Sequence, residues 1–324
     1  MKPKFYFLFV PIIAVTALLG SCSDQVDPKT GFKEIYSLNC VIRGDSSFQV
    51  ATITRSYDVS GFDPTTNHDN PFIGGADVKV FYNDSVYVFR DTTKTPPAGS
   101  NYTTPMHYYY NSKLRPQFTG PIKIQAALPN GKVLSSSVET FAINQFIMDR
   151  SSSSKIFLQG VIPQPLNFAW IYLGSPMEYY VAPELIILYS KTVNGNTIEM
   201  QKKVPLYYLN GQTPLYPPIE PDPGSIQFKM KVVDKAMEEI SAGDSNKQNY
   251  TIESAVFRLF VLDKNLTTYY SAAQTFLDEF SVRVSQPDYT NIIGGLGIFG
   301  TYAVQQLPVA FDYEYVTSFG YRLK

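Results

Sequence analysis

The sequence predicts a mainly β protein. Tyrosine (24 residues) and phenylalanine (22) are abundant and proline is frequent (23), a composition typical of strands joined by turns. Most apolar residues fall in short alternating runs separated by turn residues, and helical periodicity is scarce. We therefore expect an N-terminal immunoglobulin- or transthyretin-like β-sandwich, followed by a second β-rich domain with one or two short helices.

The first 21 residues are predicted to be a lipoprotein signal peptide. Lys2 and Lys4 precede an apolar stretch that ends at Gly20, short of the roughly 20 residues that a membrane-spanning helix needs. LGSC at residues 19–22 looks like a bacterial lipobox, in which the cysteine thiol receives a diacylglycerol before cleavage. We predict that Cys22 is the lipidated first residue of the mature chain, with acyl chains such as palmitate, and that residues 22–32 are a tether. The alternative is an ordinary secretory signal with an incidental cysteine.

Residues 33–147 carry the strand signals of the N-terminal sandwich. EIYSLNCVIR and FQVATITR are predicted strands. ADVKVFYNDSVYVFRD predicts a hairpin that turns at Asn83-Asp84, and IKIQAALPNGKVLSSSVETF predicts one that turns at Pro129 to Gly131. The segment thus contains at least six predicted strands, enough for a sandwich of about 100 residues.

A small polar segment, MDRSSSSK at residues 148–155, predicts a flexible connector to a second domain over residues 156–324. Two helices are predicted there, in DKAMEEISAG and DKNLTTYYSAAQTFLDEF. The Pro-rich segment 214–224 is expected to run over the surface. Strands are predicted in KIFLQGVI, EYYVAPELIILYS, IQFKMKVV, SAVFRLFVLD and VAFDYEYV.

Composition and charge argue against several classes of protein. Cleavage would remove Lys2 and Lys4 and take the formal net charge from −1 to −3, and the chain has no basic stripe, so we expect no nucleic-acid partner. Once Cys22 is lipidated, Cys40 has no disulfide partner and is expected to be a small buried side chain.

Candidate catalytic and metal-binding groups are scarce. His68 and His107 lie in predicted loops, and no serine stands in a G-x-S-x-G setting. Too few His and Cys residues are present for a four-ligand zinc site. The segment Asp63 to Gly74 alternates oxygen ligands but lacks the glycine and glutamate of an EF-hand, and RGD at residues 43–45 is interpreted as a turn. We expect no enzymatic activity, no cofactor and no metal.

GGLGIFG at residues 294–300 has the G-x-G-x-x-G spacing of a dinucleotide-binding turn. Such a turn needs a strand before the glycines and a helix after them, and Pro287 and Pro308 leave little room for that arrangement. We predict instead that these glycines let backbone segments pack closely and turn sharply.

Tyrosines recur side by side, at residues 108–110, 179–180, 207–208 and 269–270. Exposed tyrosines would suit stacking on sugar rings or burial in a protein interface. Because neighbouring residues of a strand face opposite sides, the alternative is that one of each pair belongs to the core and the other to the rim.

The lipobox, the predicted sandwich and the closing segment together resemble a family of Bacteroidota lipoproteins known as domain of unknown function 4249. NIIGGLGIFG at residues 291–300 is similar to the family's N-I-x-G-G-x-G-x-F-G ending, and FIGGADVKVFYNDSVYVF is similar to its early hairpin. The longer Pro-rich segment 214–224 departs from the family's pattern. The resemblance implies an outer-membrane lipoprotein, often encoded beside TonB-dependent transporters, with no assigned catalytic residues.

We therefore expect a lipid-anchored outer-membrane protein that serves as a non-enzymatic accessory or substrate-presenting partner of a TonB-dependent transporter. The alternative is a surface lipoprotein that binds a glycan or peptide ligand. The sequence is compatible with attachment to either the periplasmic or the extracellular face of the outer membrane. DSV at residues 84–86 and DTT at residues 91–93 look like acceptors for O-glycosylation in this phylum, which would place sugar on Ser85 or Thr92. The alternative is that both motifs are ordinary residues at the ends of turns and carry no sugar.

Overall fold

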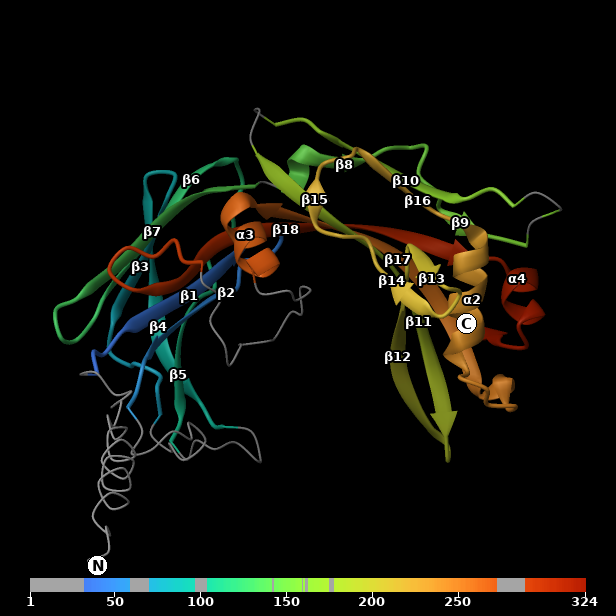
Figure 1. Cartoon of the computed structure of the whole chain (residues 1–324), viewed down its shortest axis with the longest axis horizontal. Helices are drawn as coiled ribbons and strands as arrows, with labels where there is room; N and C mark the ends of the chain where they lie inside the picture. The colour runs from blue at the N-terminus through green and yellow to red at the C-terminus, as the bar shows by residue number, and fades with distance from the viewer. Residues whose placement is uncertain are drawn as a thin grey trace, which may run out of the picture. The chain divides into compact units, whose positions relative to one another are not determined.

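The computed structural model describes residues 32–58, 70–96, 104–141, 143–158, 160, 163–174, 178–272 and 289–324. Strands predominate there over three short helices, which confirms the predicted mainly β class (Figure 1). The signal peptide, Cys22, His68 and the alternating oxygen ligands Asp63, Thr65, Asn67 and Asp69 lie outside the described residues. None of the helices in the described part is long and apolar enough to cross a membrane.

Strands and short helices follow one another along the described part of the chain. Up to residue 156 they are β1 (Tyr36–Arg43), β2 (Gln49–Arg55), β3 (Asp77–Tyr82), β4 (Ser85–Lys94), β5 (Met106–Asn111), β6 (Gly120–Ala127), β7 (Val133–Thr140), the 3-10 helix η2 (Ile143–Gln145), β8 (Phe146–Met148) and β9 (Lys155–Ile156). Then come β10 (Leu166–Tyr172), β11 (Tyr179–Val193), β12 (Asn196–Val204), β13 (Tyr207–Leu209), β14 (Thr213–Leu215), β15 (Glu220–Pro221), β16 (Ser225–Phe228), α2 (Met230–Ile240), η3 (Lys247–Asn249), β17 (Tyr250–Asp263), α3 (Lys264–Ala272), β18 (Leu296–Phe311), α4 (Tyr313–Ser318) and β19 (Arg322–Leu323).

One large sheet contains most of these strands, in the order β12-β11-β17-β18-β1-β2-β5-β4-β3-β6-β7. Strand β18 joins the two halves of the sheet, because it pairs in parallel with β1 and antiparallel with β17 (Figure 1). β8, β10 and β16 form a separate three-stranded sheet, and β13 and β14 form a short hairpin.

The predicted strands and turns of the N-terminal part are confirmed. Asn83 and Asp84 have φ of 47° and 57°, the left-handed backbone that a two-residue hairpin turn needs, and Gly131 at the second turn has φ of 83°. Strand β4 changes partners along its length: its first half pairs with β3 and its second half with β5. Buried side chains of β1, β2, β3, β5, β6 and β7 share one hydrophobic cluster. The immunoglobulin- or transthyretin-like topology stays a prediction.

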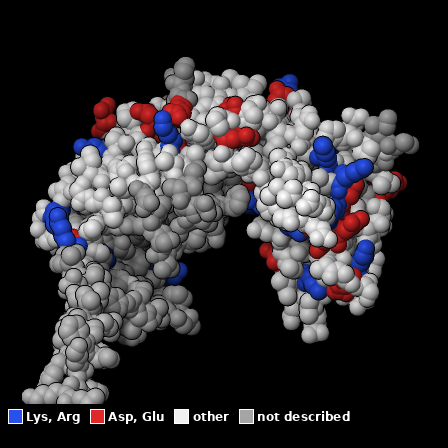
Figure 2. Space-filling view, viewed as in Figure 1, with Lys and Arg blue, Asp and Glu red and all other residues white. Residues whose placement is uncertain are grey.

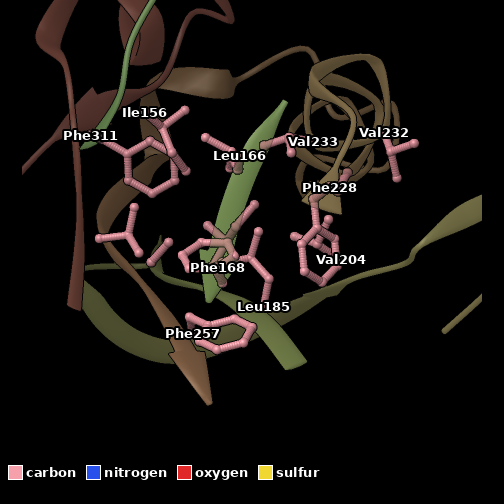
Figure 3. Close-up of a cluster of buried hydrophobic side chains, with 14 of the residues drawn as sticks. Ile156, Leu166, Phe168, Leu185, Val204, Phe228, Val232, Val233, Phe257 and Phe311 are labelled. Atoms are coloured by element: carbon pink, nitrogen blue, oxygen red, sulfur yellow. The ribbon is translucent and has the colours of Figure 1, made fainter. Parts of the chain in front are cut away.

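The C-terminal core lies between the large sheet on one side and the three-stranded sheet with α2 on the other. Figure 3 shows its centre, where Phe168 of β10 faces Phe257 of β17 with ring centroids 4.2 Å apart and ring planes 2° from parallel. Phe228 of β16 and Val233 of α2 belong to the same buried cluster. Burial of these large aromatic and branched side chains stabilises the arrangement.

Several predictions for the C-terminal part need correction. In IQFKMKVV the strand ends at Phe228 and α2 begins at Met230, because Met230, Val233 and Met237 recur at helical spacing and are buried together. In VAFDYEYV the strand ends at Phe311 and α4 follows. Among the described residues of KIFLQGVI, the strand covers only Lys155–Ile156. The second predicted helix begins as expected in α3, and its residues 273–280 lie outside the described part.

The serines of the predicted flexible connector are tied down along strand β10. The Ser152 hydroxyl donates to the carbonyl of Ala169 and accepts from the Ala169 N–H, both at 3.0 Å. The Ser153 N–H donates to the carbonyl of Asn167 at 2.7 Å, and its hydroxyl accepts from the Asn167 N–H. These hydrogen bonds attach the connector to β10. The flexibility of the connector stays a prediction.

The two predicted domains, 33–147 and 156–324, correspond in part to two hydrophobic clusters. Residues 35–324 nevertheless form one compact unit. Strand β18 contributes to both clusters, with Phe299 in the N-terminal one and Val309 in the C-terminal one. The continuous sheet therefore joins the two halves.

Gly294, Gly295 and Gly297 pack against neighbouring backbone, as predicted, whereas Gly300 packs against the side chains of Leu266 and Asp263. A Cβ atom on Gly295 would lie 2.4 Å from the carbonyl oxygen of Tyr36, and one on Gly297 would lie 2.2 Å from that of Leu38. Gly297 also has φ of 108°, which disfavours any residue with a side chain. Strand β18 rather than a helix follows Gly295, so the arrangement of a dinucleotide-binding turn is absent from this segment.

The Pro-rich segment is a surface loop that is pinned to β10 and β11. Strand β15 pairs with β11 at Tyr180 and Val181. Asp222 accepts a hydrogen bond from the Trp170 indole N–H at 2.7 Å, another from the Tyr179 hydroxyl, and a third from the Gly224 N–H at 2.8 Å. Burial and the Asp222 carboxylate raise the pKa of Tyr179.

Candidate functional site

Side chains that could hold a metal ion do not gather in the part of the chain that the structure describes. No three His, Cys, Asp or Glu side chains there lie close enough together to hold a metal ion. His107 lies on strand β5 instead of in the predicted loop, with Nδ1 2.9 Å from a carboxylate oxygen of Asp91, and the other oxygen of Asp91 accepts the Gly75 N–H at 2.5 Å. Asp91, held by His107, therefore fixes the backbone of Gly75 just before β3.

Cys40 is a buried core side chain, as expected. It lies on β1 within the N-terminal cluster, and burial raises the pKa of its thiol far above the ordinary value. A thiol held protonated in this way is a poor nucleophile.

An exposed aromatic strip crosses three strands of the N-terminal part. Tyr109 of β5 is fully buried, so its neighbours Tyr108 and Tyr110 face the other side of the sheet. Val50 of β2 and Arg90 of β4 lie directly opposite Tyr110 on the two adjacent strands. We use the name aromatic strip for Phe48, Val50, Arg90, Tyr108 and Tyr110.

The rings of the aromatic strip contact one another; Phe48 is exposed, and Tyr108 and Tyr110 are half-buried. Phe48 stacks on Tyr110 with centroids 5.7 Å apart, and Tyr108 lies 6.4 Å from Tyr110. Half of Phe48 is exposed, at 50%, although a phenylalanine gains free energy when it is buried. Aromatic side chains beside an arginine are the composition of the centre of a protein interface.

A second feature, the hairpin pocket, lies where the β3–β4 hairpin meets the segment before β6. It is an open depression of about 670 Å³. Its floor is a row of directly opposed residues on β4, β3, β6 and β7, namely Val86, Phe81, Lys123 and Ser137. Phe118 lines the pocket and is 64% exposed. The remaining lining residues are Tyr82, Asn83, Asp84, Ser85, Thr119, Gly120 and Pro121.

The backbone around the hairpin pocket is fixed from below by Tyr82. The Tyr82 hydroxyl donates to the carbonyl of Phe118 at 2.7 Å and accepts the N–H groups of Phe118 and Gln117 at 2.8 and 3.1 Å. Tyr82 itself belongs to the buried N-terminal cluster. The exposed ring of Phe118 is therefore carried by an ordered backbone.

The two predicted O-glycosylation residues differ in their surroundings. Ser85 is exposed at the start of β4, directly after the exposed Asp84 of the turn. Thr92 is half-buried opposite Tyr108, and the carboxylate of the preceding Asp91 is already bonded to Gly75 and His107. Of the two motifs, only the one at Ser85 presents both its carboxylate and its hydroxyl to solvent.

The tyrosine groups follow the alternating pattern only in part. Tyr109 is core between the half-buried Tyr108 and Tyr110, and Tyr207 is exposed beside the half-buried Tyr208. The remaining pairs, Tyr179–Tyr180 and Tyr269–Tyr270, are half-buried at both residues.

Several residues of these surfaces were not predicted as candidates from the sequence, among them Phe48, Val50, Arg90 and Phe118. The position of Val50 could have been predicted. Residues of a strand face alternate sides, so Val50 faces away from the core that holds Ala51 and Ile53. Nothing local indicated the exposed Phe118.

Charged side chains on the face shown in Figure 2 are of both signs and interspersed, without a large patch of either sign. A scan of protein-family models finds no match to this chain, and a search of curated proteins finds no significant similarity. The resemblance to the lipoprotein family therefore stays a prediction that rests on the motifs.

Proposed function

We propose that this chain is a lipid-anchored outer-membrane protein that acts as a non-enzymatic partner of a TonB-dependent transporter, docking through the aromatic strip. The proposal rests on the lipobox at Cys22 and on the resemblance of NIIGGLGIFG to the lipoprotein family. The observation that carries it is the strip itself, since an exposed Phe48 stacked on the half-buried Tyr110, which lies opposite Arg90, has the composition of an interface centre.

Lipidation makes a modest interface sufficient. An anchor confines the chain to the membrane plane, where its effective concentration near an embedded transporter is high. Several acyl chains hold a protein firmly, whereas one chain gives only marginal membrane binding. A few well-placed aromatic contacts then suffice to keep the partners together.

The test is a pull-down in mild detergent from native membranes, with a C-terminal tag on the lipoprotein. We expect the wild-type chain to recover a β-barrel transporter, and Phe48→Ala to recover at least tenfold less, because removal of an interface aromatic costs about 2 kcal/mol. Leu173→Ala is the matched control, because Leu173 is an exposed apolar residue on another part of the chain.

Two outcomes contradict the proposal. Recovery of the lipoprotein alone excludes a stable transporter partner, and equal recovery by Phe48→Ala and wild type excludes the aromatic strip as the docking surface. Cys22→Ala tests the anchor separately: if this variant stays with the outer membrane after a salt wash, lipidation at Cys22 is not what holds the protein there.

A further inference from the structure

We infer that the hairpin pocket is a binding site for a neutral saccharide, in addition to the docking surface proposed above. The pocket and the aromatic strip share no residue, so this inference goes beyond the proposed function and does not depend on it. It rests on three properties of the pocket: its aromatic surfaces, its mixed polar lining and its fixed, open shape.

The aromatic surfaces are those of Phe81 and Phe118. A hexose ring carries C–H groups on one face and hydroxyl groups around its rim, so its apolar face stacks on an exposed aromatic ring. Phe118 is 64% exposed at the rim, and Phe81 lies in the floor between Val86 and Lys123. Water leaves both surfaces when a sugar ring covers the phenyl ring, which is favourable.

The polar lining suits hydroxyl groups rather than an ion. Lys123 supplies donors, Asp84 supplies acceptors, and Asn83, Ser85 and Ser137 supply both. Because Lys123 and Asp84 carry opposite charges, the pocket has no strong preference for an anion or a cation. Sugar hydroxyl groups both donate and accept, so they match this mixed set of side chains.

The shape of the pocket suits part of a longer chain. Its volume of about 670 Å³ is in the range of small-ligand sites, and it opens at the protein surface so that a polysaccharide can continue beyond it. The floor consists of paired strands, the turn at Asn83 and Asp84 is held in a left-handed backbone, and Tyr82 fixes the backbone of Phe118. A site that is ordered before binding loses little conformational entropy when the sugar binds.

The test is isothermal titration calorimetry of the full chain with maltohexaose, cellohexaose and an α-mannohexaose. The protein is produced in a host without this O-glycosylation, because Ser85 lines the pocket, and is kept in a detergent that has no sugar headgroup. We expect at least one of these oligosaccharides to bind at millimolar concentration or below. Phe118→Ala should weaken that binding at least tenfold, and Lys123→Ala should weaken it severalfold.

The two substitutions are chosen so that a loss of sugar binding can be distinguished from a loss of folding. The side chains of Phe118 and Lys123 are exposed, and the hydrogen bonds to Tyr82 use only the backbone of residue 118, so both variants should unfold at the wild-type temperature. Tyr313→Ala is the matched control, since Tyr313 is an equally exposed aromatic residue on α4 and should bind sugar as wild type does. Absence of binding to all three oligosaccharides overturns the inference, as does equal binding by Phe118→Ala and wild type.

Discussion

Replacement of Gly297 by alanine should destabilise the protein strongly, because two separate effects coincide at this residue. The backbone φ of 108° is disfavoured for any residue with a Cβ atom, which costs about 1–2 kcal/mol. The new Cβ would also lie 2.2 Å from the carbonyl oxygen of Leu38 and 3.0 Å from Oδ1 of Asn39. β1 would have to shift to relieve that overlap. Overpacking of this kind lowers the free energy of unfolding by about 1–3 kcal/mol.

The expected total for Gly297→Ala is about 2–5 kcal/mol, a large share of the roughly 5–15 kcal/mol that stabilises a typical domain. Gly131→Ala is the matched control, because Gly131 also has positive φ, at 83°, but nothing lies within 4 Å of the added Cβ. It should lose only about 1–2 kcal/mol. Urea unfolding followed by the fluorescence of Trp170 and by circular dichroism measures both values. Equal losses in the two variants would refute the argument that β18 must approach β1 this closely.

Three further predictions concern a buried carboxylate, a partly buried hydrogen-bond acceptor and a modification. Burial raises the pKa of the Asp263 carboxyl above its ordinary value of 3.8. The protonated carboxyl therefore stabilises the fold fully below pH 3.8, and this stabilisation is lost as the pH rises through the folded-state pKa. Asp263→Asn should therefore become less destabilising, relative to wild type, between pH 3 and pH 7, and a pH-independent difference in urea unfolding would disprove this. Asp222→Ala should lower the free energy of unfolding by about 3 kcal/mol, since it leaves the Trp170 N–H and two other donors without their acceptor; a loss below about 0.5 kcal/mol in the same assay would show that the contacts contribute little. Intact-mass analysis of protein from the native host should show sugar that Ser85→Ala removes and Thr92→Ala does not, and a mass equal to polypeptide plus lipid alone would exclude the modification.

Local signals were sufficient to predict the N-terminal strands. Asn83-Asp84 and Pro129 to Gly131 lie between alternating runs, and hairpins depend on residues that are close in sequence. The register of those two hairpins follows directly from the position of the turns.

Long-range pairing was not predictable from the same signals. Strand β18 pairs with β1, more than 250 residues earlier, and no local pattern specifies a partner at that separation. In IQFKMKVV apolar and polar residues alternate, which predicts a strand throughout. Packing of Met230, Val233 and Met237 against the C-terminal core selects the helix α2 instead. The connector serines showed only a polar composition, which does not reveal that β10 lies within hydrogen-bonding distance.

The candidate surfaces were predictable only in part. Tyrosines 108–110 indicated that aromatic rings would face solvent, because alternation places at least one of three consecutive residues outward. The strip became recognisable only when Phe48, which directly precedes β2, and Arg90 of β4 were placed beside Tyr110. The hairpin pocket combines β3, β4, β6, β7 and the segment before β6, so its lining depends on the tertiary fold.

Site-specific photo-crosslinking in native membranes tests directly whether the aromatic strip docks on a TonB-dependent transporter. A photoreactive phenylalanine analogue replaces Phe48 in one strain and Leu173 in another, and crosslinked products are identified by mass spectrometry. We expect a crosslink to an outer-membrane β-barrel from position 48 and none from position 173. Crosslinks to a barrel from both positions alike, or none from position 48, would contradict the proposed docking.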